Sequence, residues 1–226
     1  MHRIIVVGGG AGGLELATRL GDRFGKRGRN GQARAAVTLV DRNPTHVWKP
    51  LLHAVAAGSM APHAHELAYA AQAFWHGFEF QEGELVGLDR IAKRVKLAPL
   101  MGDDGVELLP QREIEYDTLV IAIGSTTHYF GVAGAEEHSF ALDSVWQAER
   151  LRKRLIAACM RAEHDDEVIG SWPAVSTPDE PRIRVAIVGA GATGIDLSSE
   201  LRNTAQVLSA YGLHKLDPAS DIGIVQ

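Results

Sequence analysis

The sequence predicts an α/β fold in which parallel strands alternate with helices, and it predicts the same unit twice. The first copy opens with the apolar run 3–7, stops at three glycines, and continues with a helical period of apolar residues over 11–24. A second apolar strand over 35–40 ends at Asp41, which completes a strand–helix–strand unit of the kind that builds a parallel sheet. The opening pattern returns about 180 residues later.

The stretch between the two copies contains strands and helices of other kinds. In chain order the predicted elements are a loop over 25–32 inside the first copy, a helix over 51–58, a helix over 65–73, an antiparallel meander over 78–109, a buried strand over 116–124, an amphipathic helix over 144–162, and a loop or linker over 165–181. The second copy then comprises a strand over 183–188, a glycine turn, a helix over 195–208 and a further strand over 222–225. Two copies of one unit are the main organising fact of the chain.

Composition narrows the class of protein. The apolar fraction of 46% and the charged fraction of 23% are those of an ordinary globular protein. A net charge of −5 disfavours nucleic acid as a partner, because no basic face stands out that could neutralise phosphates. Basic residues gather only locally, and the favoured interpretation of these clusters is a solvated loop and a solvated helix face. The N-terminus lacks the pattern of a signal peptide, and no apolar stretch reaches the ~20 residues that span a bilayer. These features favour a reducing, cytoplasmic location.

Cysteine and histidine usage predicts neither thiol nor metal chemistry. The chain has one cysteine, so paired-thiol chemistry within it is excluded. Cys159 falls in the predicted amphipathic helix, where an inert small hydrophobic residue is favoured over a reactive thiol. No histidine has a third ligand at the spacing of a metal motif, so we predict no metal site. His46 and His53 are candidates to contact a cofactor, although ordinary polar or half-buried histidines are favoured.

The first glycine turn has the spacing of a dinucleotide-binding motif. Gly8 permits a tight exit from the strand, Gly10 lets the backbone approach a pyrophosphate, and Gly13 lets helix and strand pack closely. The helix that begins near Ala11 and Gly12 points its free N–H groups and the positive end of its dipole at the phosphates. This motif is weak evidence by itself, but here it follows a strand and opens a helix. The sequence therefore predicts dinucleotide binding at this turn.

An acidic residue at the end of the next strand supports the same prediction. Asp41 is placed to accept hydrogen bonds from the ribose hydroxyls of an adenosine. It lies further along than the ~20 residues usual for the motif, and the glycine-rich loop over 25–31 accounts for the excess.

The second glycine turn repeats this context with Gly189, Gly191 and Gly194. An acidic residue after its second strand would favour NADH, and a nearby arginine would favour NADPH. The chain ends before such an acid is found, so the sequence leaves the choice between NADH and NADPH open.

Several short segments of the sequence resemble those of one family of flavoproteins. Two such units separated by a meander, with a closing strand that ends at Ala122 and Gly124, resemble flavoproteins whose first unit holds FAD and whose second holds NAD(P)H. The segments 40–46, 49–52 with 55–56, and 193–196 with 200–201 look like those of type II NADH dehydrogenases, which are single-chain NADH:quinone oxidoreductases without proton pumping. By this resemblance we expect an FAD-binding domain over 1–143 and an NAD(P)H-binding domain over 144–226.

The resemblance also implies roles for individual residues. Asp196 stands where the family often has Glu, a carboxylate expected between nicotinamide and quinone; its alternative role is that of a first-turn acid that favours the helix dipole. The remaining residues that the glycine motifs and the resemblance assign to cofactor binding are Lys49, Pro50 and Leu51 beside the flavin ring, Leu85 at the adenine, Ala122, Gly124 and Ser125 over FAD, Thr193 in the second turn, and Arg42, which follows Asp41.

Partners follow from the resemblance in the same way. We expect NADH as reductant and a quinone as acceptor, and the resemblance leaves a homodimer open. The match covers about the first half of a family member. The return of the chain into the FAD domain is missing, and so is the segment by which the family sits on the inner face of the plasma membrane.

Four other assignments compete with this one. Related disulfide reductases carry a Cys-x-x-x-x-Cys pair after the first unit, and residues 48–57 contain no cysteine. Sulfide:quinone oxidoreductases share the fold but need several redox cysteines, and ferredoxin-reductase-like flavoproteins share the two units. The fourth is a nucleotide-binding or redox-sensing module without turnover.

The missing half leads to a first prediction. The 226-residue chain alone is expected to show weak or no NADH oxidation, because its second unit has too few strands to bury its sheet. The measurement is NADH consumption by the purified chain with added FAD and a soluble quinone. Sustained FAD-dependent quinone reduction by this chain would contradict the expectation.

Overall fold

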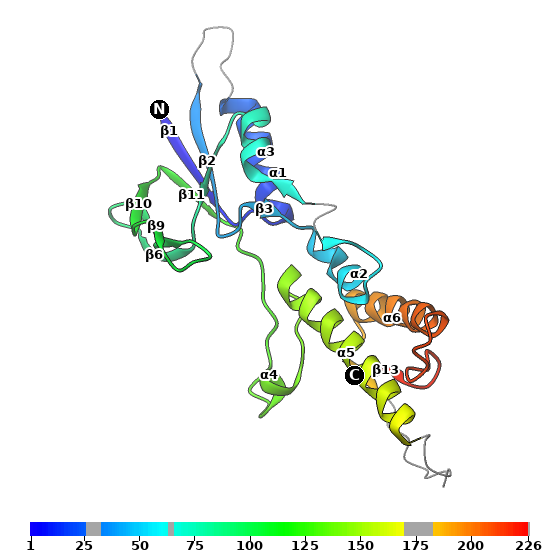
Figure 1. The fold of residues 1–226 in the computed structure, drawn as a ribbon. Helices are drawn as coiled ribbons and strands as arrows, with labels where there is room; N and C mark the ends of the chain where they lie inside the picture. The colour runs from blue at the N-terminus through cyan, green and yellow to red at the C-terminus, as the bar shows by residue number, and fades with distance from the viewer. Residues whose placement is uncertain (26–32, 63–65, 170–182, 226) are drawn as a thin grey trace. The chain divides into compact units, whose positions relative to one another are not determined.

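The structure is a computed structural model that describes residues 1–25, 33–62, 66–169 and 183–225 (Figure 1). The chain divides into two compact units. Unit 1 comprises residues 1–48 and 65–125, and unit 2 comprises residues 49–64 and 126–226. The loop predicted over 26–32 lies outside the described residues, as does most of the linker predicted over 165–181.

Unit 1 is built on a four-stranded parallel sheet. Its strand order is β11 (Thr118–Ile121), β1 (His2–Val7), β2 (Ala35–Asp41) and β5 (Glu79–Glu82). The register pairs Val7 with both Val40 and Ile121, so the carboxyl ends of the three strands meet at one edge of the sheet. The predicted strands at 3–7 and 35–40 are confirmed, whereas the strand predicted over 116–124 covers only 118–121. The predicted meander over 78–109 is wrong at its start, because β5 joins the parallel sheet beside β2.

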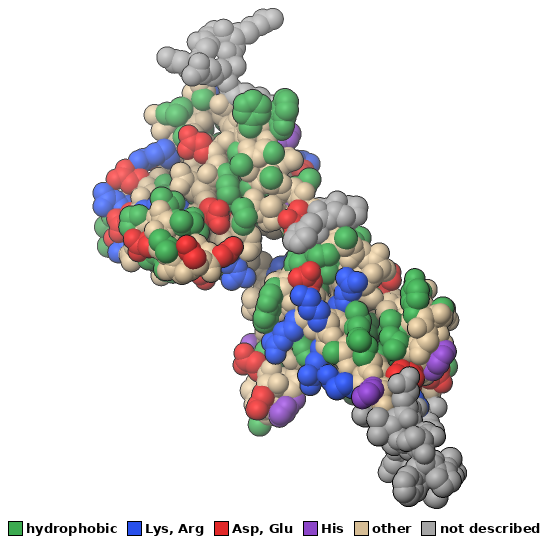
Figure 2. All heavy atoms as spheres, in the orientation of Figure 1, with side chains coloured by type: hydrophobic (Ala, Val, Ile, Leu, Met, Phe, Trp, Pro, Cys, Tyr) green, Lys and Arg blue, Asp and Glu red, His purple; other side chains and the backbone are tan. Residues whose placement is uncertain are grey.

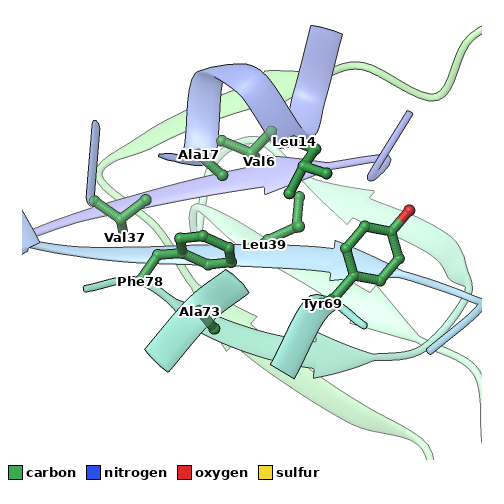
Figure 3. Packing of buried hydrophobic residues seen from close by; sticks show 8 residues of the cluster. All are labelled: Val6, Leu14, Ala17, Val37, Leu39, Tyr69, Ala73 and Phe78. Carbon is green, nitrogen blue, oxygen red and sulfur yellow. The ribbon is translucent and has the colours of Figure 1, made fainter. Parts of the chain in front are cut away.

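The two faces of this sheet bury different partners, because side chains alternate along a strand. Val6 points to the face covered by α1 (Ala11–Leu20) and α3 (Tyr69–His76), where it packs with Leu39 and Phe78 (Figure 3). Ile5 and Val7 point to the opposite face and pack with buried residues of a second sheet. The predicted helix over 11–24 is α1 followed by a π-helical turn, Gly21–Gly25.

The second sheet of unit 1 is antiparallel, with the order β10 (Arg112–Glu115), β7 (Arg94–Leu97), β6 (Leu85–Asp89). A separate pair joins β8 (Leu100–Met101) to β9 (Glu107–Leu109), so most of the predicted meander is confirmed. A third short pair joins β3 (Thr45–His46) to β4 (Leu67–Ala68). The helix predicted over 65–73 is therefore wrong at its start: residues 67–68 pair with β3, and α3 begins only at Tyr69.

Unit 2 combines packed helices with one parallel strand pair. A 3-10 turn (Lys49–Leu51) leads into α2 (Leu52–Ala57), which packs against α5 (Val145–Ile169) and α6 (Ala192–Ala210). The hydroxyl of Thr204 on α6 donates to the carbonyl oxygen of Ala57 at 2.7 Å. The remaining elements are α4 (Ala135–His138) and the parallel pair β12 (Val185–Val188) and β13 (Ile222–Val225).

The long helix of unit 2 differs from its prediction. It was expected to end at residue 162 but continues to Ile169, so the predicted linker is wrong over 165–169. The basic residues near its start form the expected solvated face, and several basic side chains gather there in Figure 2. Arg150 stacks over the rings of Phe140 and Trp146, at 5.6 and 5.3 Å from their centroids. None of the described helices is long and apolar enough to cross a membrane.

Candidate functional site

The first glycine turn joins β1 to α1 at the carboxyl edge of the parallel sheet. Gly8 has φ of +104°, and a Cβ there would lie 2.3 Å from the carbonyl oxygen of Ala122. A Cβ at Gly13 would lie 1.8 Å from the carbonyl oxygen of Gly8. Both positions therefore exclude a side chain, one through its left-handed backbone and the other through the close approach of helix and strand.

The outer side of the same turn is open. Gly10 is the N-cap of α1, with φ −60° and ψ −178°, and no side chain caps the helix. A Cβ at Gly10 or Gly12 would meet no atom within 4 Å, and the first helical turn has no acidic residue. Gly10, Ala11 and Gly12 are exposed. The helix terminus thus presents backbone N–H groups and a positive dipole end, with room for a phosphate.

Asp41 lies beside this turn at the end of β2. Its Oδ2 accepts a hydrogen bond from the Gly9 N–H at 2.6 Å, and its Oδ1 accepts from the backbone N–H of Asn43 at 2.9 Å. The carboxylate is therefore already held in place by backbone. Each carboxylate oxygen has two lone pairs, so Asp41 retains capacity to accept from a ribose hydroxyl.

Two buried side chains contact the carbonyl oxygen of Gly9: Tyr69, which the sequence analysis did not single out, and His46, which it named only as a candidate to contact a cofactor. The carbonyl oxygen of Gly9 accepts from the hydroxyl of Tyr69 at 2.7 Å, and Nδ1 of His46 lies 2.8 Å from the same oxygen. Both side chains are buried. A Cβ at Gly9 would lie 2.4 Å from the Tyr69 ring. The signal for this contact was the middle one of three consecutive glycines, since the motif itself leaves that position free.

Burial, and next the charge of Asp41, raise the pKa of Tyr69 far above its ordinary value. The phenol therefore stays protonated at neutral pH and acts as a donor to the Gly9 carbonyl.

Other predicted residues of unit 1 lie along the same sheet edge. The Ala122 N–H donates to the carbonyl oxygen of Val7 at 2.7 Å, which brings the end of β11 beside the first turn. Gly124 follows with φ of +73°, and Ser125 is the last residue of this segment in unit 1. The chain leaves β5 towards Leu85 with the Gly83 N–H bonded to the carbonyl oxygen of Asp41 at 2.8 Å.

The second glycine turn has the same backbone geometry as the first. Gly189 has φ of +107°, and a Cβ at Gly194 would lie 2.1 Å from the carbonyl oxygen of Gly189. Gly191 is the N-cap of α6 with φ −72° and ψ 174°, and a Cβ there would again meet open space. Thr193 is exposed in the first turn of α6.

The strand register locates the position that corresponds to Asp41 in the second copy. The Gly8 N–H donates to the carbonyl oxygen of Val40, the residue before Asp41, and the Gly189 N–H donates likewise to that of Val225. The next residue in the sequence is Gln226, which lies outside the described residues. In the sequence this residue is a neutral amide, so no acid follows β13 within the 226 residues, as the sequence analysis expects.

The remaining predicted residues are divided between the two units. Lys49, Pro50 and Leu51 form the 3-10 turn of unit 2, whereas Arg42 is exposed after β2 in unit 1. Asp196 is exposed on α6. It is the fifth residue of that helix, so its alternative role as a first-turn acid is wrong.

Cys159 lies in the interior of unit 2. Its side chain is buried, and burial raises the pKa of its thiol. A protonated, inaccessible thiol is a poor nucleophile, as expected for an inert small hydrophobic residue.

Two turns of one geometry, each between a parallel strand and a helix, define an α/β protein with two Rossmann-like strand–turn–helix units. Comparison with protein families agrees: the model described as pyridine nucleotide-disulphide oxidoreductase matches residues 2–217. The chain therefore belongs to the pyridine nucleotide-disulphide oxidoreductase family.

Within this family, the chain is similar in sequence to type II NADH:quinone oxidoreductases. The chain is 42% identical to a type II NADH:quinone oxidoreductase of Haemophilus influenzae over 220 residues, which are 96% of this chain and 48% of that relative. It is 26% identical to a type II NADH:quinone oxidoreductase of Staphylococcus epidermidis over 214 residues, 93% of this chain and 46% of the relative. The predicted resemblance to this group is confirmed. The chain spans about half the length of the curated relatives it matches.

Solved structures agree on the fold. NDH2 of Plasmodium falciparum in complex with NADH has a TM-score of 0.72 at 18% identity, covering 99% of this chain and 41% of that one. The sulfide:quinone oxidoreductase of Aquifex aeolicus has a TM-score of 0.60 at 23% identity, covering 96% and 42%. The predicted α/β fold with a Rossmann-like first unit is confirmed.

The two kinds of glycine in the first helical turn give a testable contrast. We expect Gly13→Ala to destabilise the fold by about 1–3 kcal/mol, because its Cβ overlaps the Gly8 carbonyl. Gly12→Ala adds the same methyl group to the same helical turn but into open space, so it is the control and should leave stability unchanged or slightly raised. Urea unfolding compares the two. Equal midpoints would mean that the contact does not constrain the turn.

Proposed function

We propose that this chain forms part of an FAD-dependent NADH:quinone oxidoreductase, with FAD at the first glycine turn and NAD(P)H at the second. The observation that carries the proposal is the repeated geometry, with φ of +104° at Gly8 and +107° at Gly189 and an open N-cap glycine in each turn. Two dinucleotide sites in one chain suit hydride transfer from one bound dinucleotide to the other. The names of the relatives supply quinone as the acceptor.

The residues of unit 1 fit the adenosine diphosphate part of FAD. The space that a Cβ at Gly10 would fill is free, and the exposed amides of Ala11 and Gly12 would bind the pyrophosphate. Asp41 would accept from the ribose. The further contacts proposed from the resemblance are Arg42, Lys49, Pro50, Leu51, Leu85, Ala122, Gly124 and Ser125.

The residues of unit 2 fit a second dinucleotide. Gly189, Gly191 and Gly194 shape the turn, and Thr193 adds an exposed hydroxyl beside the helix terminus. Asp196 is exposed one helical turn further on, and we assign its carboxylate to the region between nicotinamide and quinone.

The bound flavin supplies the redox chemistry, as an acceptor of hydride and a donor of electrons. The chain aligns the two dinucleotides, holds their phosphates on helix termini and excludes competing reactions. No cysteine occurs in residues 48–57, where related reductases carry a thiol pair. Electrons would therefore pass from the flavin to an external acceptor. The proposed acceptor is a quinone in a membrane. Contact with the cytoplasmic membrane face through further residues, and homodimerisation, belong to the same proposal.

The test of this function is a flavin spectrum. The protein extended by the half that its relatives have, and loaded with FAD, should lose its flavin absorbance when NADH is added without oxygen. Added quinone should then restore it. An FAD-loaded sample without NADH is the control.

The other outcomes separate the alternatives. Bleaching by sulfide but not by NADH would favour a sulfide:quinone oxidoreductase, the fold shared with the Aquifex structure. Bleaching by neither would favour a nucleotide-binding module without turnover.

The residue after β13 bears on the choice of coenzyme. We propose that Gln226, which follows Val225 in the sequence as Asp41 follows Val40, lets the second site accept NADPH as well as NADH. A carboxylate at this position would repel a 2′-phosphate, whereas an amide is neutral and has both a donor and an acceptor.

The prediction is a change of preference by one substitution. Gln226→Glu should weaken NADPH binding by about tenfold or more relative to NADH, because a new carboxylate faces the 2′-phosphate. Gln226→Asn keeps a neutral amide and is the control. The measurement is the ratio of the two dissociation constants. An unchanged ratio in the Glu variant would show that residue 226 does not distinguish NADPH from NADH at the ribose.

A further inference from the structure

The peptide between Gly9 and Gly10 is held from one side only. Its carbonyl oxygen points at two buried groups, the Tyr69 hydroxyl at 2.7 Å and Nδ1 of His46 at 2.8 Å. Gly10, at the other end of the peptide, is exposed, and a Cβ on it would meet no atom within 4 Å. We propose that Tyr69 and His46 are positioning residues that aim the Gly10 N–H outward as a donor to a phosphate of the bound dinucleotide.

The geometry of a peptide bond connects the two observations. In a trans peptide the C=O and N–H groups point in opposite directions, and the described residues contain no cis peptide. A carbonyl pinned towards Tyr69 and His46 therefore turns the Gly10 N–H to the open side of the turn. Among the described residues no acceptor is paired with this N–H. Two donors on the carbonyl also polarise the peptide, which strengthens the N–H as a donor.

The neighbouring peptide is held from the opposite side. The Gly9 N–H belongs to the peptide between Gly8 and Gly9, and it donates to Oδ2 of Asp41 at 2.6 Å. Both peptides that flank Gly9 are thus fixed before a ligand arrives. A preorganised donor loses less conformational entropy on binding than a mobile one.

A short strand pair brings the two donors to one carbonyl. β3 and β4 pair His46 with Leu67 and Thr45 with Ala68, and the Tyr69 N–H then donates to the carbonyl oxygen of Pro44 at 3.1 Å. The His46 and Tyr69 rings lie edge to face with their centroids 6.2 Å apart. This pair forms a small sheet separate from the main sheet, with two residues on each strand.

The core of unit 1 fixes the tyrosine ring. Tyr69 packs in the hydrophobic cluster of Figure 3, and its hydroxyl lies at the edge of that cluster. The centroid of the Tyr69 ring is 5.0 Å from the centroid of the Phe80 ring. The contact requires glycine at position 9, because a Cβ there would lie 2.4 Å from the ring. The second turn has Ala190 at the same place in the sequence. The glycine at position 9 is therefore explained by the nearby Tyr69 ring. The described part of the second turn, which has Ala190 at this place, has no such ring contact.

The experiment rests on the proposed function, in which the first turn holds FAD. It uses the protein with the half that its relatives add, and it measures FAD affinity from flavin fluorescence. Tyr69→Phe removes one donor and keeps the ring, and we expect the dissociation constant for FAD to rise about tenfold with an unchanged thermal midpoint of the apoprotein. NADH affinity at the second turn should not change. Tyr116→Phe, at a buried tyrosine of the other core cluster, is the matched control.

Histidine variants test the second donor. His46→Leu should weaken FAD binding to a similar degree, while His46→Asn keeps a side-chain N–H near the position of Nδ1 and should restore most of the affinity. A purely structural role would not distinguish them in this way. If Tyr69→Phe fails to fold, the comparison of the two histidine variants decides.

The outcomes separate this inference from the proposed function. Unmodified protein that binds no FAD would overturn the proposed function. Unmodified protein that binds FAD, with Tyr69→Phe and His46→Leu binding it equally well, would overturn the positioning role alone.

Discussion

The backbone of α1 approaches the end of β1 so closely that a Cβ at Gly13 would lie 1.8 Å from the carbonyl oxygen of Gly8. This contact sets the position of the helix terminus on the sheet edge. The open amides of Gly10 to Gly12 and the acid at the end of β2 face one region only because helix and strands meet in this way. The same contact recurs between Gly194 and Gly189 at 2.1 Å, so one steric constraint shapes both candidate sites.

A second constraint is the alternation of side chains along β1. Val6 faces the helices and Ile5 and Val7 face the antiparallel sheet, so a strand of six residues takes part in two cores at once. Both faces of the parallel sheet are therefore covered, and ligands have access only at its edge. The glycine turn, Asp41 and the end of β11 lie at that edge, which is where open α/β sheets bind ligands.

Several elements were predictable because their signals are local. Apolar runs that stop at glycine mark β1 and β12, and the spacing of Gly8, Gly10 and Gly13 indicates a turn that opens a helix. β5, Glu79–Glu82, was assigned to the meander because it has only one apolar residue, Phe80, between polar neighbours, as in a half-exposed strand. Its parallel partner β2 is about forty residues away in the chain. The end of α5 was missed because acidic residues at 165–167 resemble a linker, although they are compatible with a helix.

The amino-acid sequence by itself determined the two dinucleotide-type turns, the position of Asp41 and the absence of a thiol pair, because each depends on residue type at a short spacing. Only the tertiary structure decided that His46 and Tyr69 meet at the carbonyl of Gly9, since their contacts span 37 and 60 residues of chain. Only the strand register decided that Val225 pairs with Val188 as Val40 pairs with Val7. Long-range pairing of this kind depends on how strands align across the sheet, and no local pattern in the sequence encodes that alignment.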